Sequence, residues 1–364
     1  MSETVLKQQE RIAFALRGLY RQYGYLPYKM SKFEPYDLYA SNKEFLTSEG
    51  IITFNDTDGK LLALKPDVTM SIIKNAAQGV KRKVYYHENV YRISGETKQF
   101  KEIPQVGVEC MGDLDAYDLF ETVKLAAESL NAISSNFALD VAHLGILSAL
   151  LEELALGETF NQAVVEKISQ KNLHELEEQC VRFGVSEKKA QSLLQLVRTY
   201  GDMQTVLLQI APYCKTERAK KAYDELQTLC SLLKTLPYAD KIRFDFSVVN
   251  DMHYYNGFVF KGFVDGVCES VLSGGEYGGL MAKMGKNTDA IGFAVYLDLL
   301  EGFNQEKNAF DVDILLLYDD NADLQKLADT VQKWIALGNS VCAQKNENGV
   351  RYAKLIKLAE VDND

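Results

Sequence analysis

Residues 104–112 read Pro-Gln-Val-Gly-Val-Glu-Cys-Met-Gly, and no other stretch says as much about how this chain folds. Apolar and other residues alternate along it with the period of two that is typical of a β-strand. On a strand, Gln105 and Glu109 share one face, and Gly107 leaves a gap between them. An amide and a carboxylate beside a missing side chain predict a pocket for a small ligand with an amino group. Taken alone, the same pattern also describes an edge strand whose polar face lies in solvent.

The segments on both sides of this strand predict a sheet with helices around it. The apolar patterns indicate strands at 51–54, 61–64, 83–92, 105–112, 243–249, 257–264 and 268–272, and helices at about 4–23, 67–77, 114–131 and 289–302. Glycine-rich residues 273–275 are expected to follow the last of these strands. From about 143 to 236 the patterns are helical throughout. Because sheet segments resume after this helical insertion, we predict an α+β fold with mostly antiparallel pairing.

The composition indicates a globular chain, and its length suggests two or three domains. The 364 residues are 47% hydrophobic and 25% charged, which is ordinary for folded proteins. We expect a main domain at 1–310, which holds the insertion, and a short α/β tail at 311–364. The formal net charge of −11 disfavours nucleic-acid binding, because the affinity for nucleic acids depends largely on neutralising phosphates.

The cysteines and histidines give no sign of a disulfide framework or a metal site. The six cysteines include no C-x-x-C pair, and the four histidines are dispersed along the chain. The N-terminus lacks the apolar core of a signal peptide, and no run of 18 uncharged apolar residues occurs. We therefore expect a cytoplasmic protein with no membrane contact, no metal and no cofactor.

Three further places carry polar or aromatic side chains that could line a pocket. Asp67 and Thr69 lie where a strand turns into a helix, although either would also serve as a simple helix cap. Arg92 ends a strand and could bind a phosphate or a carboxylate, or it could lie in solvent. Tyr254 and Tyr255 are expected to point to opposite faces, so that one of them presents its hydroxyl to a cavity.

The order of these segments resembles the successive motifs of the histidyl-tRNA synthetase family. The matching stretches are Phe-Asn-Asp at 54–56, Leu-Lys-Pro-Asp-Val-Thr at 64–69, Tyr-Arg at 91–92, Gln-Val-Gly-Val-Glu at 105–109, Tyr-Tyr-Asn-Gly-Phe-Val-Phe at 254–260, Ser-Gly-Gly-Glu-Tyr at 273–277 and Ile-Gly-Phe-Ala at 291–294. The resemblance runs from about residue 5 to residue 303. It implies the class II aminoacyl-tRNA synthetase fold, an antiparallel sheet flanked by helices, in a protein that is usually dimeric.

The resemblance also implies roles for single residues. Carried over one residue at a time, it assigns binding of the histidine substrate to Asp67, Thr69, Gln105 and Glu109. It assigns aromatic positions of the same pocket to Tyr254 or Tyr255 and to Tyr277. It assigns contact with the α-phosphate and the carboxylate during adenylation to Arg92. These assignments favour the pocket over the edge strand and the simple cap.

The chain departs from the family pattern mainly at positions that handle ATP. Asn250 stands where a histidine-specific arginine is expected, and Leu299 stands where an arginine should hold the γ-phosphate. Ser94 replaces a glutamate near the motif arginine, and Glu276 replaces the arginine of a Gly-Gly-Arg-Tyr-Asp pattern. A neutral amide does little to stabilise the charge that develops on an α-phosphate. We therefore expect no catalytic residues and no aminoacylation.

With this pocket, these losses and only the 54 residues of 311–364 as a tail, the chain resembles the regulatory subunits of ATP phosphoribosyltransferase. That family implies a hetero-oligomer with the short catalytic subunit, which performs the first step of histidine biosynthesis. It implies that the regulatory chain activates this partner, binds histidine as a ligand and contributes to feedback control. It further implies a self-dimer within the hetero-oligomer. The tail is about half the size of an anticodon-binding domain, so we expect no tRNA binding.

Two alternatives stay open from the sequence alone. A divergent histidyl-tRNA synthetase, or another amino-acid-adenylating enzyme, would have to hold ATP without arginines at positions 250 and 299. A stand-alone amino-acid sensor would bind histidine without associating with a phosphoribosyltransferase.

Overall fold

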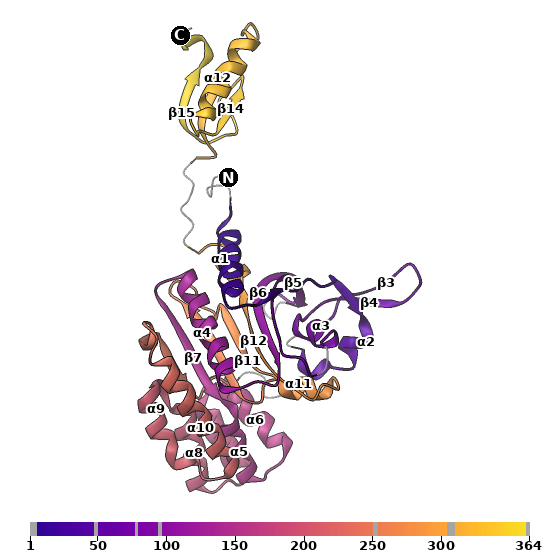
Figure 1. Ribbon diagram of the computed structural model, residues 1–364, viewed down its shortest axis with the longest axis vertical. Helices are drawn as coiled ribbons and strands as arrows, with labels where there is room; N and C mark the ends of the chain where they lie inside the picture. The colour runs from indigo at the N-terminus through magenta and orange to yellow at the C-terminus, as the bar shows by residue number, and fades with distance from the viewer. Residues whose placement is uncertain are drawn as a thin grey trace. The chain divides into compact units, whose positions relative to one another are not determined.

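The computed structural model describes residues 6–46, 50–76, 79–93, 97–249, 254–303 and 310–361 of the chain. The chain divides into two compact units, Met1–Phe303 and Asn304–Asp364 (Figure 1). No helix in these described ranges is both long and apolar enough to cross a membrane.

A nine-stranded sheet runs through the described part of the larger unit. Its strands are β1 (Leu26–Pro27), β5 (Arg82–Ile93), β6 (Phe100–Gly112), β7 (Phe137–His143), β8 (Tyr200–Asp202), β9 (Ile242–Asp245), β10 (Phe258–Val264), β11 (Leu272–Glu276) and β12 (Asp289–Tyr296). They lie in the order β1-β5-β6-β12-β11-β10-β7-β9-β8. Neighbours are antiparallel except in the pairs β1–β5 and β7–β9. This sheet confirms the predicted α+β class with mostly antiparallel pairing.

Two helices pack on one face of the sheet, α1 (Gln8–Gln22) and α4 (Ala116–Ile133) (Figure 1). α1 buries Ile12, Leu16 and Tyr20, which recur at the spacing of a single helical face. The Tyr20 hydroxyl lies 3.0 Å from the Ser129 hydroxyl of α4, so the two helices are joined by a polar contact inside the apolar layer. The main hydrophobic core lies between these helices and the sheet.

Smaller elements lie on the opposite side of the sheet. They are β2 (Phe33–Pro35), α2 (Tyr36–Ala40), the 3₁₀ turn η2 (Lys43–Phe45), β3 (Thr53–Asn55), β4 (Leu61–Leu64), α3 (Thr69–Lys74) and α11 (Gly278–Lys283). Among them the exposed strand β3 extends away from the sheet (Figure 1). β2, β4 and β3 form a small antiparallel sheet, in which β3 and β4 make the predicted hairpin. A second core, which includes Tyr39, Met70 and Tyr277, joins these elements to the main sheet.

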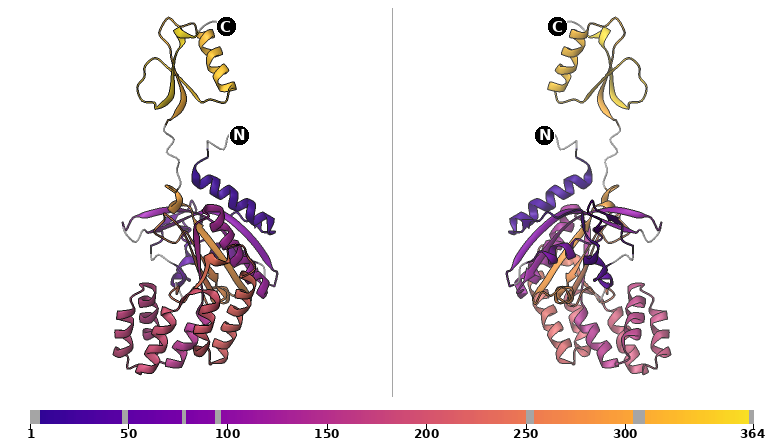
Figure 2. Two further views of the ribbon diagram at one scale, coloured as in Figure 1. Left: turned by 90° about the vertical axis from the view of Figure 1, so that its left-hand side faces the viewer. Right: turned by 90° about the vertical axis from the view of Figure 1, so that its right-hand side faces the viewer.

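The segment between β7 and β9 is largely helical. Its helices are α5 (Leu144–Leu154), α6 (Glu158–Ser169), α7 (Leu173–Arg182), α8 (Glu187–Arg198), α9 (Met203–Ile210) and α10 (Glu217–Leu233). Figure 2 shows them grouped below the sheet. The short strand β8 interrupts this helical segment and pairs with β9. Several of these helices begin at side-chain caps, for example Asn172, Asp202 and Thr216.

The smaller unit is a parallel α/β layer. It contains β13 (Val312–Leu317), α12 (Leu324–Ala336), β14 (Val341–Gln344) and β15 (Tyr352–Lys357). The strands lie in the order β14-β13-β15, with both pairs parallel. Ile314, Leu315 and Leu316 of the central strand are fully buried, so this unit has an apolar centre of its own.

Two predictions about the end of the larger unit are wrong. The helix expected at 289–302 is the strand β12, followed by the 3₁₀ turn η5 (Asp298–Leu300). The strand expected at 268–272 begins only at Leu272, so the glycine-rich residues lie inside β11. β12 is covered on both faces, and its apolar run therefore lacks the alternation that distinguishes a strand from a helix.

Candidate functional site

A pocket of about 120 Å³ opens on the face of the sheet opposite α1 and α4. It lies over β5, β6, β12 and β11, which are consecutive in the sheet. The residues predicted to form a histidine-like pocket all contribute to its wall, namely Asp67, Thr69, Arg92, Gln105, Glu109, Tyr254, Tyr255 and Tyr277. The structure therefore brings together side chains that are up to 210 positions apart in the sequence.

β6 supplies the two polar groups at the centre of the pocket. Gln105 and Glu109 face the pocket, whereas Val106, Val108 and Cys110 belong to the main core on the other face. β6 lies between β5 and β12, which excludes the alternative of an edge strand with its polar face in solvent. Gln105 and Glu109 are only 3% and 2% exposed, so this polar face is buried.

Two glycines make room for this buried polar face. A Cβ atom on Gly292 of β12 would overlap the Glu109 carboxylate, and a Cβ atom on Gly107 would overlap the Tyr86 hydroxyl. The gap that Gly107 leaves between the polar side chains of β6 is therefore occupied by Tyr86 from β5. Tyr86 was not predicted as a pocket residue. It lies on the same face of β5 as Arg92, so the alternation of side chains along this strand could have indicated it.

Glu109 is enclosed by two hydroxyl donors. Thr69 Oγ1 donates to Oε1 at 2.8 Å, and Tyr277 Oη donates to Oε2 at 2.5 Å. Burial nevertheless raises the pKa of Glu109 to about 8, since two neutral donors replace only part of its hydration and the Asp67 carboxylate opposes ionisation further. A cationic group on a ligand would supply a counter-charge, so Glu109 is a candidate anchor for an amine or an imidazole.

Asp67 both caps a helix and faces the pocket. Its Oδ1 accepts the Met70 N–H at 2.9 Å, and its Oδ2 lies 3.7 Å from Nη2 of Arg92. Burial raises the pKa of Asp67 in spite of this arginine and the backbone donors. Arg92 Nε donates to the Pro66 carbonyl at 2.7 Å, and the arginine side chain is 17% exposed. The alternative of a solvated strand-end arginine is therefore wrong, while the cap and the pocket wall are both observed at Asp67.

The amide of Gln105 has an unmet hydrogen bond. Its Nε2 is buried and has no acceptor among the residues that the structure describes. A buried donor without a partner costs about 1–3 kcal/mol. A ligand with an acceptor atom would satisfy this donor on binding.

The tyrosines form an aromatic wall. Both Tyr254 and Tyr255 line the pocket, so the prediction that they point to opposite faces is wrong. They precede β10 in a turn, where the alternation of a strand does not apply. The Tyr254 ring lies edge-on to Tyr255, with centroids 4.7 Å apart, and 6.0 Å from the ring of Tyr277. Ser273 and Tyr296 complete this side of the pocket and were not predicted.

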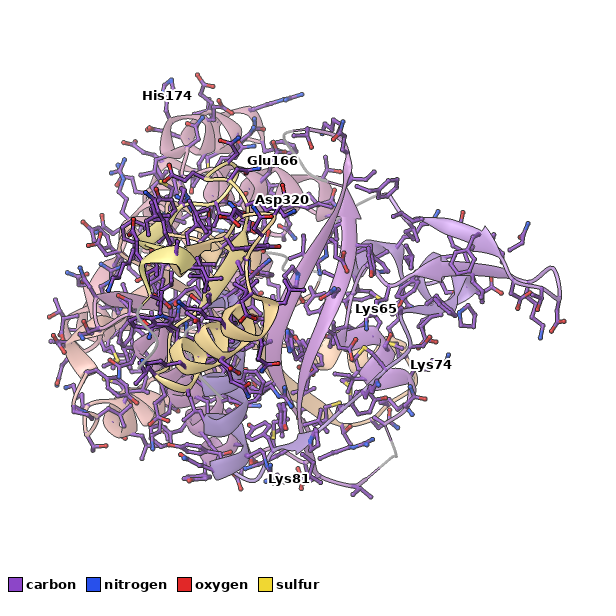
Figure 3. All side chains as sticks on the ribbon, turned by 90° about the horizontal axis from the view of Figure 1, so that it is seen from above. Lys65, Lys74, Lys81, Glu166, His174 and Asp320 are labelled. Carbon is purple, nitrogen blue, oxygen red and sulfur yellow. The ribbon has the colours of Figure 1, made fainter. Side chains whose placement is uncertain are left out.

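Two lysines near the strands of the pocket are each paired with a carboxylate. The side chain of Lys65, which Figure 3 labels, is fully buried. Its Nζ lies 2.5 Å from Glu88 of β5. Lys101 Nζ lies 2.6 Å from Asp298, which follows β12. Arg92 has its own carboxylate neighbour, as described above. Each of these three cations therefore already has an anionic partner.

Two of the positions that depart from the synthetase pattern lie among the described residues, and neither supplies a cation. Leu299 lies in η5 and packs against the main core. Glu276 is not part of the pocket wall, and its Oε2 accepts the Phe258 N–H at 2.6 Å. Ser94 and Asn250 lie outside the described residues. Within the described residues, no three His, Cys, Asp or Glu side chains are grouped as a metal ion would require.

Comparison of the whole chain with known proteins identifies its family. A family model described as histidyl-tRNA synthetase matches residues 2–300. An ATP phosphoribosyltransferase regulatory subunit from Alkaliphilus metalliredigens is 29% identical over 284 residues, covering 76% of this chain and 71% of the relative. The predicted resemblance to such regulatory subunits is thereby confirmed.

Solved structures show the same fold. A protein from Bacillus halodurans, described as an ATP phosphoribosyltransferase regulatory subunit/histidyl-tRNA synthetase, gives a TM-score of 0.78 at 24% identity and covers 98% of this chain and 96% of that chain. A chain from the Thermotoga maritima structure described as an ATP phosphoribosyl transferase (HisG:HisZ) complex gives a TM-score of 0.62 at 18% identity, covering 79% of this chain and 97% of that chain. The predicted class II synthetase fold is confirmed.

Proposed function

The chain belongs to the histidyl-tRNA synthetase family, and we propose that within it this protein acts as a non-catalytic regulatory subunit of ATP phosphoribosyltransferase. In this role it activates the short catalytic subunit and contributes to feedback control by histidine. The observation that carries the proposal is a pocket with the polar groups for an amino acid, next to cations that are already paired with carboxylates.

The pocket offers groups that suit histidine. Asp67 and Glu109 can accept hydrogen bonds from an ammonium group and an imidazole N–H, and Arg92 can pair with a carboxylate. Gln105 Nε2 has no acceptor within the described ranges, and histidine offers one in its carboxylate and one in its imidazole. The cavity volume of about 120 Å³ is small against the roughly 300–1,000 Å³ of typical ligand sites. It therefore suits a single amino acid better than an aminoacyl-adenylate.

The charges around the pocket argue against adenylation. Catalysis on a triphosphate depends on cations aimed at the charge that develops on the phosphates. Lys65 and Lys101 each lie beside a carboxylate, Leu299 supplies no charge, and of these three cations Arg92 alone is left to face the ligand. We infer that the chain has lost aminoacylation activity.

The names of the relatives support the proposed partner. The Thermotoga maritima structure is described as a complex of two kinds of chain, and curated relatives at 25–29% identity are named regulatory subunits. We place the protein in a cytoplasmic hetero-oligomer with the short catalytic subunit, as a self-dimer and without tRNA. Control by histidine requires that histidine binds two states of this complex with different affinity, because equal binding shifts nothing.

Phosphoribosyl-ATP formation tests the proposal. The short catalytic subunit from the same organism is assayed with and without this protein over a titration of histidine. Strong activation that histidine reverses is the expected result. No change in rate, together with no co-elution of the two chains, would overturn the proposal.

A divergent histidyl-tRNA synthetase or another amino-acid-adenylating enzyme is the alternative, and the match of the family model over residues 2–300 favours it. Histidine-dependent exchange of pyrophosphate into ATP separates the two functions. We expect no exchange above the level of an Arg92→Ala variant.

A further inference from the structure

Glu276 occupies a position where the family pattern has an arginine, and in this chain it is hydrogen-bonded to the backbone of a neighbouring segment. Its Oε2 accepts the backbone N–H of Phe258, the first residue of β10, at 2.6 Å. Its backbone carbonyl accepts the N–H of Asn256 at 3.0 Å. Glu276 is thus bonded twice to the segment that leads from Tyr254 into β10.

The lack of a side chain at Gly257 leaves room for the carboxylate of Glu276. A Cβ atom at position 257 would overlap Oε2 and Cδ of Glu276. Gly257 is not among the glycines with a left-handed backbone, so space is the reason for a glycine here. The carboxylate therefore lies directly against the backbone that it holds.

Charged groups from neighbouring elements surround Glu276. Burial raises the pKa of Glu276, the hydrogen bond from the Phe258 N–H opposes this rise, and the carboxylates of Glu225 on α10 and Asp289 on β12 add to it. The His143 ring lies edge-on to Phe258 with centroids 4.7 Å apart, and its Nε2 lies 2.8 Å from Glu225 Oε2. The Glu276 carboxylate thus has one fixed donor, the Phe258 N–H, while both ring nitrogens of His143 are bonded to other groups.

We propose that Glu276 is a positioning residue for the pocket, whose carboxylate anchors the Phe258 end of the Tyr254–Phe258 segment to β11 and thereby fixes the aromatic wall. The neighbouring residue, Tyr277, lines the pocket from the same strand end, and the Tyr255 ring packs where a side chain on Gly275 would lie. Release of the segment would move Tyr254 and Tyr255 and leave the groups on β6 in place. The proposal rests on the proposed function only for the identity of the ligand.

Hydrogen exchange of the Phe258 amide tests this in the full chain without a ligand. Glu276→Ala removes the acceptor and should speed exchange of this amide roughly tenfold, the factor for losing about 1.4 kcal/mol. Glu276→Gln keeps an acceptor and should stay within about threefold of the unaltered protein, as should Glu178→Gln at an exposed carboxylate. If Glu276→Ala leaves the Phe258 amide unchanged, or speeds exchange equally in α4, the positioning role is refuted.

Calorimetric titration with histidine tests the link to the pocket. Glu276→Ala should weaken binding roughly tenfold and Glu276→Gln should restore it. Gly257→Ala displaces the carboxylate and should weaken binding alone, but should add no loss when combined with Glu276→Ala, because the overlapping group is then absent. Additive losses would overturn the proposal. If the unaltered protein binds no histidine, the proposed function fails, while the exchange experiment still decides the role of Glu276.

Discussion

Replacing Glu109 by glutamine should make the ligand-free protein more stable at neutral and alkaline pH. Burial raises the pKa of this carboxyl to about 8, from an ordinary value of 4.5. The folded chain therefore binds the proton more tightly than the unfolded chain, so the stability gained from protonation is fully present below about pH 4.5 and is lost as the pH rises toward 8. At about 1.4 kcal/mol per pKa unit, the loss between pH 5 and pH 8 amounts to roughly 3–4 kcal/mol. Glutamine keeps the shape and does not titrate.

Urea unfolding of both proteins between pH 5 and pH 8.5 measures this effect. The free energy of unfolding of the unaltered protein should fall relative to Glu109→Gln, with a slope that approaches about 1.4 kcal/mol per pH unit. Glu178→Gln, at an exposed carboxylate, should follow the unaltered protein. A difference between Glu109→Gln and the unaltered protein that stays constant within about 0.5 kcal/mol over this range would refute the reasoning.

Three further substitutions test the site. Gly292→Ala places a methyl group where the Glu109 carboxylate lies, so it should destabilise the fold by about 1–3 kcal/mol in thermal melting and abolish histidine binding in calorimetry. Gly279→Ala is the control, because a methyl group there meets nothing within 4 Å and should change neither measurement. Gln105→Leu removes a buried donor without an acceptor, so urea unfolding should show a gain of about 1–2 kcal/mol while histidine affinity falls; a loss of stability would contradict the unmet hydrogen bond. Lys65→Met leaves the carboxylate of Glu88 without its partner and should lower the free energy of unfolding in urea by about 3 kcal/mol. The double variant Lys65→Met/Glu88→Gln should recover most of this loss. Equal losses of stability in the single and the double variant would show that the ion pair contributes little.

The sequence indicated β6 well because its two faces meet different surroundings. Val106 and Val108 enter an apolar core, while Gln105 and Glu109 enter a polar pocket, so the alternation survives in the sequence. β12 lacks this signal because it is covered on both faces, and its run of apolar residues was therefore mistaken for a helix. β7, with seven residues between two helices, was not predicted at all.

The polar wall of the pocket was predicted more completely than its shape. Matching motifs indicated the carboxylates, the amide and the arginine, because their residue types are distinctive. The contact of Tyr86 with Gly107 depends on the register of β5 against β6, which a single sequence does not specify. Tyr254 and Tyr255 were placed on opposite faces by applying the alternation of a strand, which does not hold in the turn that precedes β10.

The short strand β8 has a consequence for anyone who wishes to shorten this chain. It lies between α8 and α9, yet it pairs with β9 at the border of the large sheet. Deleting the whole helical segment would therefore also remove β8 and leave the backbone N–H and C=O groups on the outer side of β9 without partners. An uncovered strand border of this kind recruits other chains and promotes aggregation. A shortened chain should keep Tyr200–Asp202, or have another strand paired with β9, if it is to stay soluble at high concentration.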